Sequence, residues 1–488
     1  MSDAEGIMWA VEKDPALRSD FCNLTVLDRS PSRARMHEAA RAAIAAIPRL
    51  GQRVVAAPLR LVPPAWVDDP ALDLDYHVRF VGVPHPGGTR ELLDLCASLA
   101  EAPFDRSRPL WEFTVIHGLV DGRAAMLQKV HHTITDGVGG LRLSLALVDL
   151  ERDPRPDAST VAVLRRELAE VVADVPRDPI ARTSPLDVTR DAVVDAAGRS
   201  VAVARRAAAE ALETLRTPTS IPTRASEAAA LAASLRRQLL VTEGARSDVL
   251  RARSLRRHFA IAAASLPEAK EAATRLGGTI NDVFVTALTG GLGAYHRAHG
   301  GHATDLRLAM PVSTRTRGDA DANQFTPARV VVPMGPDDPV ARFDVVRERL
   351  AAARGEVALH AAQGLASIAA LLPTAMLVPI VRNQARTIDF AASNLRGSPV
   401  PLYLAGARIE ASYPFGPRTG CALNVTLLSY CDEVHLGYNI DTAAVVDPDE
   451  LLAMIETSWH DVVHASRARR RTSSARRRGA GAERRSGT

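Results

Sequence analysis

The sequence predicts an α/β protein made of two sandwich-like domains that are joined by a helical crossover. The chain has 488 residues, which is too many for one ordinary domain. Strand-like and helix-like segments alternate in residues 1–150 and again in residues 251–465. Between them, residues 151–250 are rich in alanine and arginine and are interrupted by prolines, and residues 466–488 form an arginine-rich tail. We therefore expect two α/β domains, a helical crossover and a disordered tail with these bounds.

The first domain contains segments with clear periodicity. Apolar residues recur at helical spacing in residues 32–47 and 91–102. Residues 113–119 and 123–132 look like two strands joined by a turn of sequence Val-Asp-Gly. Residues 73–83 also read as a strand, which would end at a proline- and glycine-rich turn.

The second domain alternates in the same way. Residues 266–276 predict a helix that ends at the Gly277–Gly278 pair, a typical helix C-cap. Asp338 is a plausible N-cap for a long helix that starts at Pro339. The other expected elements are a helix over 281–296, strands over 306–311 and 328–333, and a hairpin formed by 422–430 and 433–440.

The net charge of +4 comes from the tail. Residues 466–488 contain nine arginines and one glutamate, so the rest of the chain is net acidic and does not indicate a nucleic-acid-binding domain. The tail lacks apolar periodicity. Either it is attracted to anionic lipid, at about 1 kcal/mol for each basic residue near the surface, or it is a solvated segment without a role.

The cysteine content and the hydropathy of the sequence indicate where in the cell the protein is located. Four widely spaced cysteines without a Cys-x-x-Cys pair favour neither a disulfide framework nor a zinc site, and they indicate a reducing compartment. Residues 1–14 contain no apolar signal core. The longest apolar run, 365–381, is short for a membrane span and is broken by Pro373 and Pro379. This run predicts either a buried helix pair or a surface that contacts lipid or an acyl chain.

The sharpest local signal is the sequence His-His-Thr-Ile-Thr-Asp-Gly at residues 131–137, where an expected strand ends. Neighbouring residues of a strand point to opposite faces, so His131 and His132 cannot easily share one metal ion, and we expect no metal. A single histidine acting as general base fits better, because its pKa lies near neutrality. His132 adjoins the turn and is the candidate base, while His131 would support the motif. Two ordinary histidines at a strand end are the alternative interpretation.

The rest of the motif suggests a supporting role. Asp136 is expected to hold the turn, and Gly137 allows a positive φ or a close backbone approach. The start of the following helix would offer N–H groups to developing negative charge. Neither a Gly-x-Ser-x-Gly sequence nor a nucleophilic cysteine adjoins the motif, so no acyl-enzyme intermediate is expected.

The motif and its surroundings resemble the bacterial wax ester synthase/diacylglycerol acyltransferase family. This family belongs to the His-His-x-x-x-Asp-Gly superfamily, together with chloramphenicol acetyltransferase and the condensation domains of peptide synthetases. Besides the motif, the resemblance rests on Leu72–Arg79, Pro84–Gly88, Phe104–Glu112, Thr279–Val283, Met310–Arg315, Ser393–Asn394 and Asn439–Asp441. It covers residues 1–465 and is weakest over 151–250. No proline follows Ser393–Asn394 as it does in the family, and Cys431–Glu433 replaces a glycine-containing turn, which leaves the acceptor alcohol open.

The resemblance implies two chloramphenicol-acetyltransferase-like domains with the active site between them. It implies transfer of a fatty acyl group from acyl-CoA to the hydroxyl of diacylglycerol or a long-chain fatty alcohol, giving triacylglycerol or wax ester plus CoA. Acyl-CoA would be a co-substrate, no cofactor would be needed, and nucleic acid would not be a partner. The protein would be cytoplasmic, free or peripheral on the inner membrane face or on lipid droplets.

The same resemblance implies substrate-binding residues outside the motif. They are Pro109, Leu110, Trp111, Asn281, Asp282 and Arg315. Each also has an ordinary structural explanation: Trp111 can be a core residue, and Asn281–Asp282 can cap a helix. Arg315 can pair with Asp136 across the domain interface or lie on the surface.

Two rival functions remain at this point. A condensation-type transferase acting on another donor and acceptor would keep the same histidine chemistry. A catalytically silent lipid-binding protein is the other rival. The joint presence of His132, Asp136 and Gly137 argues against it, because a silent protein would not need a base and its turn.

Overall fold

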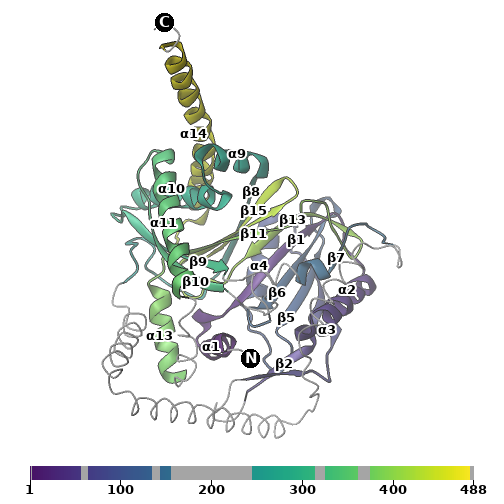
Figure 1. Ribbon diagram of the computed structural model, residues 1–488. Coiled ribbons are helices and arrows are strands. Elements are labelled where there is room, and N and C mark those ends of the chain that lie inside the picture. The colour runs from purple at the N-terminus through teal and green to yellow at the C-terminus, as the bar shows by residue number, and fades with distance from the viewer. Residues whose placement is uncertain are drawn as a thin grey trace, which may run out of the picture.

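The computed structural model describes residues 1, 3–56, 64–134, 143–154, 244–313, 325–360 and 374–483. Within them, two large mixed sheets lie next to each other, and helices cover their outer faces (Figure 1). This is the α/β class that the alternation of segments predicts.

The first half of the chain supplies most of the first sheet. The strands of this half are β1 (Asp20–Leu27), β2 (Gln52–Val55), β3 (Ala65–Asp68), β4 (Val78–Gly82), β5 (Trp111–His117), β6 (Ala124–His131) and β7 (Val148–Asp149), of which β2 and β3 form a separate two-stranded sheet. Its helices are α1 (Asp3–Val11), α2 (Arg33–Ala46), α3 (Leu74–His77) and α4 (Thr89–Glu101), with short 3-10 turns at Pro15–Leu17, Pro48–Gly51 and Val120–Gly122.

The second half supplies the second sheet and most of the long helices. The strands of this half are β8 (His258–Ser265), β9 (Asp305–Ser313), β10 (Phe325–Pro333), β11 (Phe390–Arg396), β12 (Tyr403–Leu404), β13 (Ala407–Phe415), β14 (Leu423–Tyr430) and β15 (Glu433–Ile440). Its helices are α9 (Leu266–Leu276), α10 (Ile280–Ala298), α11 (Pro339–His360), α13 (Thr374–Arg386) and α14 (Pro448–Glu483).

Strands from both halves of the chain form the first sheet, whose order is β4-β5-β6-β1-β13-β12-β7. β1 pairs antiparallel with β6, with Asp20 opposite His131 and Asn23 opposite Gln128. On its other side β1 pairs antiparallel with β13, so that Cys22 lies opposite Phe415. The second sheet has the order β10-β9-β11-β14-β15-β8. A strand pair from the second half therefore completes the sheet that carries the histidine motif.

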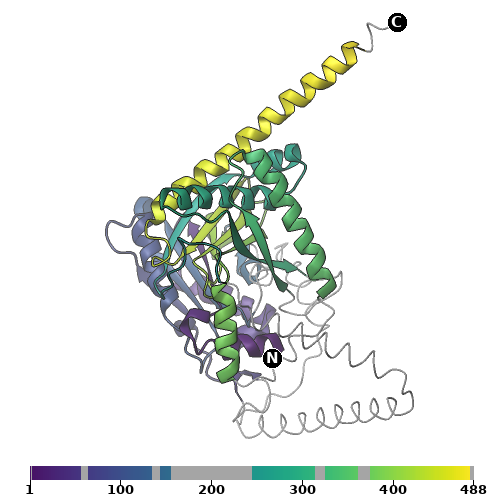
Figure 2. The same ribbon diagram turned by 90° about the vertical axis from the view of Figure 1, so that its left-hand side faces the viewer.

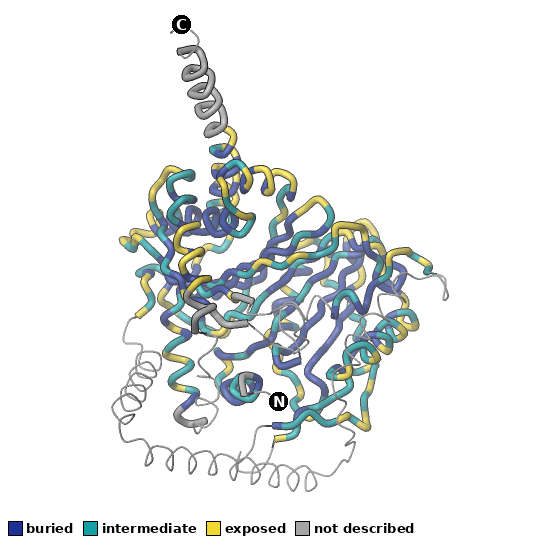
Figure 3. The backbone as a smooth tube through the Cα atoms, in the orientation of Figure 1, coloured by how far each residue is buried: buried dark blue, intermediate teal, exposed yellow. Residues whose placement is uncertain are grey.

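Helices cover the sheets unequally. α9, α10, α11 and α14 pack together against the second sheet and enclose a large apolar core (Figure 2). α4 packs between the two sheets: Cys96 belongs to an apolar cluster with Leu24 of β1 and Phe259 of β8. Figure 3 shows that the strands of both sheets are largely buried, whereas the outer helices alternate between buried and exposed residues. The first sheet is thus held on one face by a helix that also contacts the second sheet.

The structure confirms most expected elements and corrects some. The 266–276 helix ends at Gly277, which adopts a left-handed conformation with φ of 74°, and the hairpin over 422–440 is present as β14 and β15. The expected strand over 73–83 instead starts with the short helix α3, because Asp73 accepts hydrogen bonds from the backbone N–H groups of Asp75 and Tyr76. α14 continues to Glu483, into the range 466–488 for which disorder is expected. The disorder of the tail stays a prediction. Alanine and arginine favour helix, and this explains the extension.

The domain bounds of 1–150 and 251–465 stay a prediction, although the second range contributes β12 and β13 to the first sheet. Most of the crossover, residues 155–243, lies outside the described residues, as does the apolar run up to residue 373. The remainder of that run lies in α13, where Leu377 and Ala385 pack with Val11 of α1. None of the described helices is both long enough and apolar enough to cross a membrane.

Candidate active site

The two histidines of the motif lie where β6 ends beside the start of β1. Side chains alternate along β6: Met126 and Val130 contribute to the apolar cluster on one face of the sheet, and Leu127 contributes to the cluster under α4 on the other. His131 is the last residue of β6 and belongs to the second series, whereas His132 is the first residue of the turn after the strand. The two imidazoles have different neighbours: that of His131 contacts Glu12 and Thr133, and that of His132 contacts Phe21.

His131 is locked into the structure. Its side chain is 1% exposed. Nδ1 lies 2.6 Å from Thr133 Oγ1, and Nε2 makes a hydrogen bond to the Glu12 carboxylate. Glu12 also accepts a hydrogen bond of 2.9 Å from the backbone N–H of Ser19. His131 thus ties the segment before β1 to the end of β6, and its supporting role in the motif stays a prediction.

Glu12 is a residue that the sequence did not identify. It lies 119 residues before His131 and belongs to no periodic pattern or motif. Only the pairing of β1 with β6 brings the segment before β1 to the histidine.

His132 has a more open environment than His131, since its side chain is only half-buried. Its backbone N–H donates to the carbonyl of Ser19 at 2.9 Å, which fixes the main chain at the turn. The imidazole lies against the Phe21 ring, with 5.0 Å between ring centroids. The His132 imidazole therefore lies beside any cavity that the Phe21 ring lines.

Phe21 borders a largely apolar cavity with a volume of about 100 Å³. The cavity lies against β1 and β6 and is closed by β13 and by segments near residues 395–404 and 428–430. Its wall includes Val130 on the His132 side, followed by Met126 farther along β6. Among its aliphatic lining residues are Leu143, Leu147, Leu402, Leu404, Ile409 and Leu428. The apolar lining of this cavity suits a segment of a hydrocarbon chain.

A strip of polar side chains crosses this cavity. Asn23 and Gln128 face each other across β1 and β6, and Asn23 Nδ2 donates to Gln128 Oε1 at 3.2 Å. Ser412 of β13 donates to Asn23 Oδ1 at 3.1 Å, and Ser144 donates to Gln128 Oε1 at 3.2 Å. All four residues line the cavity. They could orient a substrate that carries polar groups within its apolar body, and the sequence alone did not reveal them.

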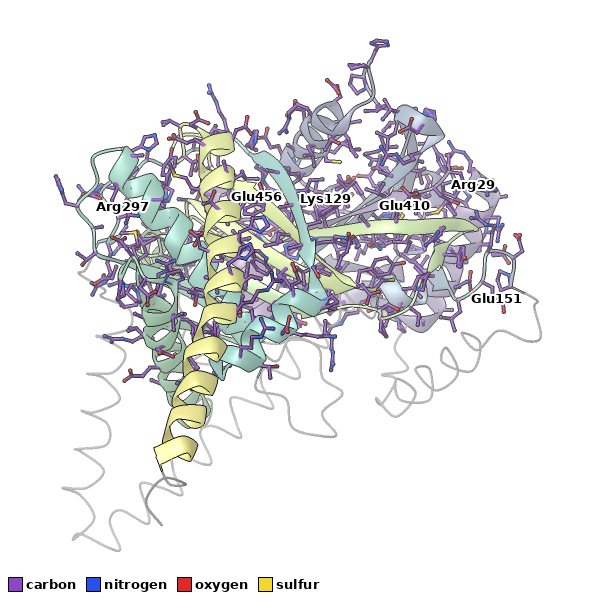
Figure 4. The ribbon with its side chains drawn as sticks, turned by 90° about the horizontal axis from the view of Figure 1, so that it is seen from above. Arg29, Lys129, Glu151, Arg297, Glu410 and Glu456 are labelled. Carbon is purple, nitrogen blue, oxygen red and sulfur yellow. The ribbon has the colours of Figure 1, made fainter. Side chains whose placement is uncertain are left out.

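On the opposite face of the first sheet, the buried Lys129 binds the end of α4. Lys129 Nζ donates to the carbonyls of Leu99 and Ala102 at the C-terminal end of α4, where the helix dipole favours a cation. It also lies 4.5 Å from the centre of the Phe104 ring. In Figure 4 Lys129 lies near the middle of the molecule, while Arg29 and Arg297 lie at opposite margins. Lys129 therefore fixes α4 against β6 two residues before His131.

The Pro109–Trp111 segment, predicted to contact substrate, is part of the core. Leu110 and Trp111 are 1% and 0% exposed. The Trp111 indole N–H donates to the carbonyl of Leu50 at 2.7 Å, and its ring stacks on His77 with 4.4 Å between centroids. These contacts give the segment a structural explanation; a direct substrate contact stays a prediction.

Asn281 and Asp282 lie at the start of α10, but neither is its N-cap. Thr279 is the N-cap, and Asp282 completes a capping box by accepting from the Thr279 backbone N–H at 2.8 Å. Asn281 Nδ2 instead lies 3.5 Å from the sulfur of Met310 on β9. The expected cap was therefore misplaced by two residues, and the role of both residues in substrate binding stays a prediction.

Three other predicted residues, Asp136, Gly137 and Arg315, lie outside the described residues. Their roles, and the proposed pairing of Asp136 with Arg315, stay predictions. Among the described residues, no group of three or more His, Cys, Asp or Glu side chains could hold a metal ion.

Three buried thiols are poor nucleophiles. Burial, reinforced by the nearby Asp20 charge, raises the pKa of Cys22 to about 12. Burial also raises the pKa of Cys421 to about 11 and that of Cys96 well above its ordinary value. Because the thiolate is the reactive form, these cysteines are not suited to carry an acyl group near neutral pH.

Known proteins are similar to this chain over most of its length. Residues 1–284 match the profile of the wax ester synthase/diacylglycerol acyltransferase catalytic domain, and residues 322–462 match the C-terminal domain of the same family. A Mycobacterium tuberculosis protein provisionally named a diacylglycerol O-acyltransferase is 35% identical over 94% of this chain and 90% of its own length. A Mycobacterium bovis protein with the same provisional name is 29% identical over 87% of this chain and 86% of its own.

Solved structures show the same fold. A wax ester synthase/diacylglycerol acyltransferase from Marinobacter aquaeolei superposes with a TM-score of 0.56 at 22% identity, covering 92% of this chain and 95% of the other. The first condensation domain of the CDA synthetase superposes with a TM-score of 0.55 at 15% identity, covering 96% and 95%. Taken with the two profile matches, these likenesses show that the chain is an acyltransferase of the wax ester synthase/diacylglycerol acyltransferase family.

Proposed function

We propose that this acyltransferase moves a fatty acyl group from acyl-CoA to the hydroxyl of diacylglycerol, with His132 as the general base. One observation carries the assignment of the base. His131 is buried and bonded to Glu12 and Thr133, whereas His132 is half-buried and lies against Phe21, which lines the apolar cavity. Of the two imidazoles, only that of His132 lies on the side of the sheet where a lipid substrate could approach.

The reaction follows from ordinary base catalysis. His132 accepts the proton of the alcohol hydroxyl, and the oxygen attacks the thioester carbonyl. The tetrahedral intermediate collapses by breaking the carbon–sulfur bond, and the CoA thiolate then recovers a proton from the imidazolium. A thiol has a pKa of roughly 8.5, so the leaving group needs little help from an acid. Base catalysis of this kind supplies about 10²- to 10⁴-fold of the rate.

The reaction needs no cofactor besides the acyl-CoA co-substrate, because every proton transfer can pass through the imidazole. A covalent acyl-enzyme is also unnecessary, because the alcohol oxygen can attack the thioester directly. Burial, which raises the pKa of Cys22 and of Cys421, makes these two thiols poor acyl carriers as well. The intermediate oxyanion would be stabilised by backbone N–H groups at the start of the helix that the sequence predicts after the motif, which lies outside the described residues.

Two observations favour diacylglycerol as the acceptor. The mycobacterial relatives are provisionally named diacylglycerol O-acyltransferases. The polar strip of Asn23, Gln128, Ser144 and Ser412 in the cavity could contact the ester groups of diacylglycerol, which a simple fatty alcohol lacks. A long-chain alcohol is the second candidate, because the related Marinobacter protein is named a wax ester synthase as well.

The lipid substrates place the enzyme at a lipid surface during turnover. Diacylglycerol and triacylglycerol remain in membranes or droplets, so the enzyme would bind there peripherally. The arginine-rich end of α14 projects away from the body of the protein and is the segment best suited to contact anionic lipid (Figures 1 and 2).

Turnover with defined acceptors tests the proposal. Purified protein is incubated with radiolabelled palmitoyl-CoA and with diolein, hexadecanol or hexadecylamine, and CoA release and labelled products are measured together. We expect labelled triacylglycerol as the main product and loss of CoA release in His132→Ala. Faster formation of wax ester would reassign the acceptor, and amide as the only product would contradict O-acyl transfer.

A further inference from the structure

A second cavity, with a volume of about 270 Å³, lies where the segment before β1 meets residues of the second half of the chain. Its wall is strongly basic. The charged lining residues are Arg18, Arg253, Arg256, Arg257 and Arg418, together with the carboxylates of Glu101 and Asp441. Arginines thus outnumber acidic groups in the lining, which is unusual in a chain that is net acidic outside its tail.

Two of these arginines are paired with carboxylates. Arg257 Nη1 lies 2.8 Å from Asp20 Oδ2, and Arg418 Nη1 lies 3.0 Å from Asp441 Oδ2. These pairs fix the positions of the two guanidinium groups but neutralise much of their charge. They form the rigid part of the wall.

The remaining arginines supply the excess charge. Arg253 donates to the backbone carbonyls of Gly420 and Ile388, and its burial lowers its pKa, so a nearby anion would stabilise its charged form. Arg18 donates to the carbonyl of Glu101 at 2.9 Å. Arg256 is exposed, and within the described residues its guanidinium has neither a hydrogen bond nor an ion pair. None of these three arginines forms an ion pair with a described carboxylate.

The position of the cavity connects it with the reaction. Arg18 immediately precedes Ser19, whose carbonyl accepts the hydrogen bond from the His132 backbone. Two residues after Ser19, Phe21 begins the lining of the apolar cavity. Residues on the two sides of Ser19 in the sequence therefore line the basic and the apolar cavity, and Ser19 itself binds the backbone of His132.

We propose that the basic cavity binds phosphate groups of the acyl-CoA donor while the thioester end reaches His132. This inference rests on the proposed function and adds the place where the donor is held. Guanidinium groups suit phosphate because their planar N–H donors form paired, charge-assisted hydrogen bonds with its oxygens. CoA joins several phosphates to its sulfur through a long flexible arm, so a basic site can hold one end of the donor while the other reacts. A phospholipid headgroup carries the same chemistry, and the experiment distinguishes the two sources.

Reversal of one exposed charge tests the site. Arg256→Glu should raise the KM for palmitoyl-CoA by about tenfold, the loss of one charge-assisted contact, and change kcat little. The KM for palmitoyl-pantetheine, which lacks the nucleotide phosphates, should stay the same. Arg41→Glu is the matched control, because Arg41 is an exposed arginine of α2 that does not line the cavity. Arg18→Glu should reproduce the effect of Arg256→Glu.

Direct binding separates this inference from the proposed function. Calorimetric titration of the full chain with CoA should give weaker binding in Arg256→Glu than in Arg41→Glu. An unchanged KM and an unchanged CoA affinity in both cavity variants would overturn the phosphate site even if acyl-CoA is turned over. If the cavity variants lose binding to phosphatidylglycerol vesicles but keep their affinity for CoA, the phosphate site for CoA is overturned too. That result would assign the cavity to lipid headgroups. Absence of turnover with intact CoA binding would instead contradict the proposed function.

Discussion

Asp20 and Arg257 form a bidentate ion pair between the two halves of the protein. Asp20 is the first residue of β1, and Arg257 directly precedes β8; the two N–O distances are 2.8 and 3.3 Å. Both side chains are at least nine-tenths buried. Burial alone would raise the pKa of the Asp20 carboxyl, but the charge and hydrogen bonds of Arg257 outweigh this effect and lower the pKa. The pair therefore joins the strand beside the motif to the second sheet.

Removal of one partner should destabilise the protein strongly. Asp20→Asn or Arg257→Ala should each lower the free energy of unfolding by about 3–5 kcal/mol, because the remaining group stays buried without its partner. The double variant should lose less than the sum of the two. Denaturant unfolding measures all three, and Asp94→Asn, which breaks an exposed pair with Arg90, is the control, with an expected loss of about 0–1 kcal/mol. Additive losses would contradict the coupling.

The Asp20–Arg257 pair should also make the free energy of unfolding depend on pH in the acidic range. The folded pKa of Asp20 lies below the unfolded value of roughly 3.9, so its contribution is complete above that pH. The contribution is then lost as the pH falls through the folded pKa. Unfolding free energies measured from pH 6 downward should therefore fall more steeply below about pH 4 in the wild type than in Asp20→Asn. Parallel curves would show that Asp20 does not carry the effect.

The two histidines should respond differently to substitution. His132→Ala should abolish CoA release without unfolding the protein, because its imidazole is half-buried and faces the apolar cavity side. His131→Ala should mainly reduce stability and leave measurable turnover, and Glu12→Gln should resemble it because Glu12 accepts the His131 hydrogen bond. Circular dichroism and a CoA-release assay separate the two effects. A natively folded His131→Ala variant without activity, beside an active His132→Ala variant, would reverse the assignment.

The local spacing of residues in the sequence was sufficient to predict part of this site. Alternation along a strand placed His131 and His132 on opposite faces, and the same alternation gives Met126, Gln128 and Val130 as neighbours on the His132 side. Glu12, Asp20 and Ser412 could not be found in this way. They reach the site through the pairing of β1 with β6 and β13, and long-range register leaves no local pattern in the sequence. The cap of α10 was misplaced by two residues because both Thr279 and Asn281 are good cap residues.

Filling the apolar cavity should select against long chains. Ile409 is a buried residue of β13 that lines this cavity. Ile409→Trp should reduce turnover of palmitoyl-CoA with diolein more than turnover of butyryl-CoA with a short alcohol. Overpacking costs about 1–3 kcal/mol of stability, so the melting temperature is measured for the same preparation. Equal loss with all chain lengths would show that the cavity does not hold a substrate chain.

Removal of the polar strip should change the choice of acceptor. Gln128→Leu keeps the approximate size of the side chain but deletes the amide that contacts Asn23 and Ser144. We expect kcat/KM to fall about tenfold for diolein, the value of one lost hydrogen bond, and to change little for hexadecanol, which has no ester group. Competition between the two acceptors in one reaction measures this ratio. A ratio equal to that of the wild type would exclude the strip from acceptor recognition.

The arginine-rich end of α14 should act in lipid binding and not in chemistry. The structure sets the place for a truncation: Ser466 is 1% exposed and bonded to the Val463 carbonyl, and Arg467 pairs with Glu268 of α9. A chain that ends after Arg467 keeps these contacts and loses eight of the nine tail arginines. It should sediment less with anionic liposomes at low salt, while turnover on detergent-dispersed substrate stays the same.

High salt should weaken binding of the intact chain similarly, because salt screens exposed charges beyond a Debye length of about 10 Å at 0.1 M. If the truncated chain sediments like the intact one at both salt concentrations, lipid attraction by this segment is excluded.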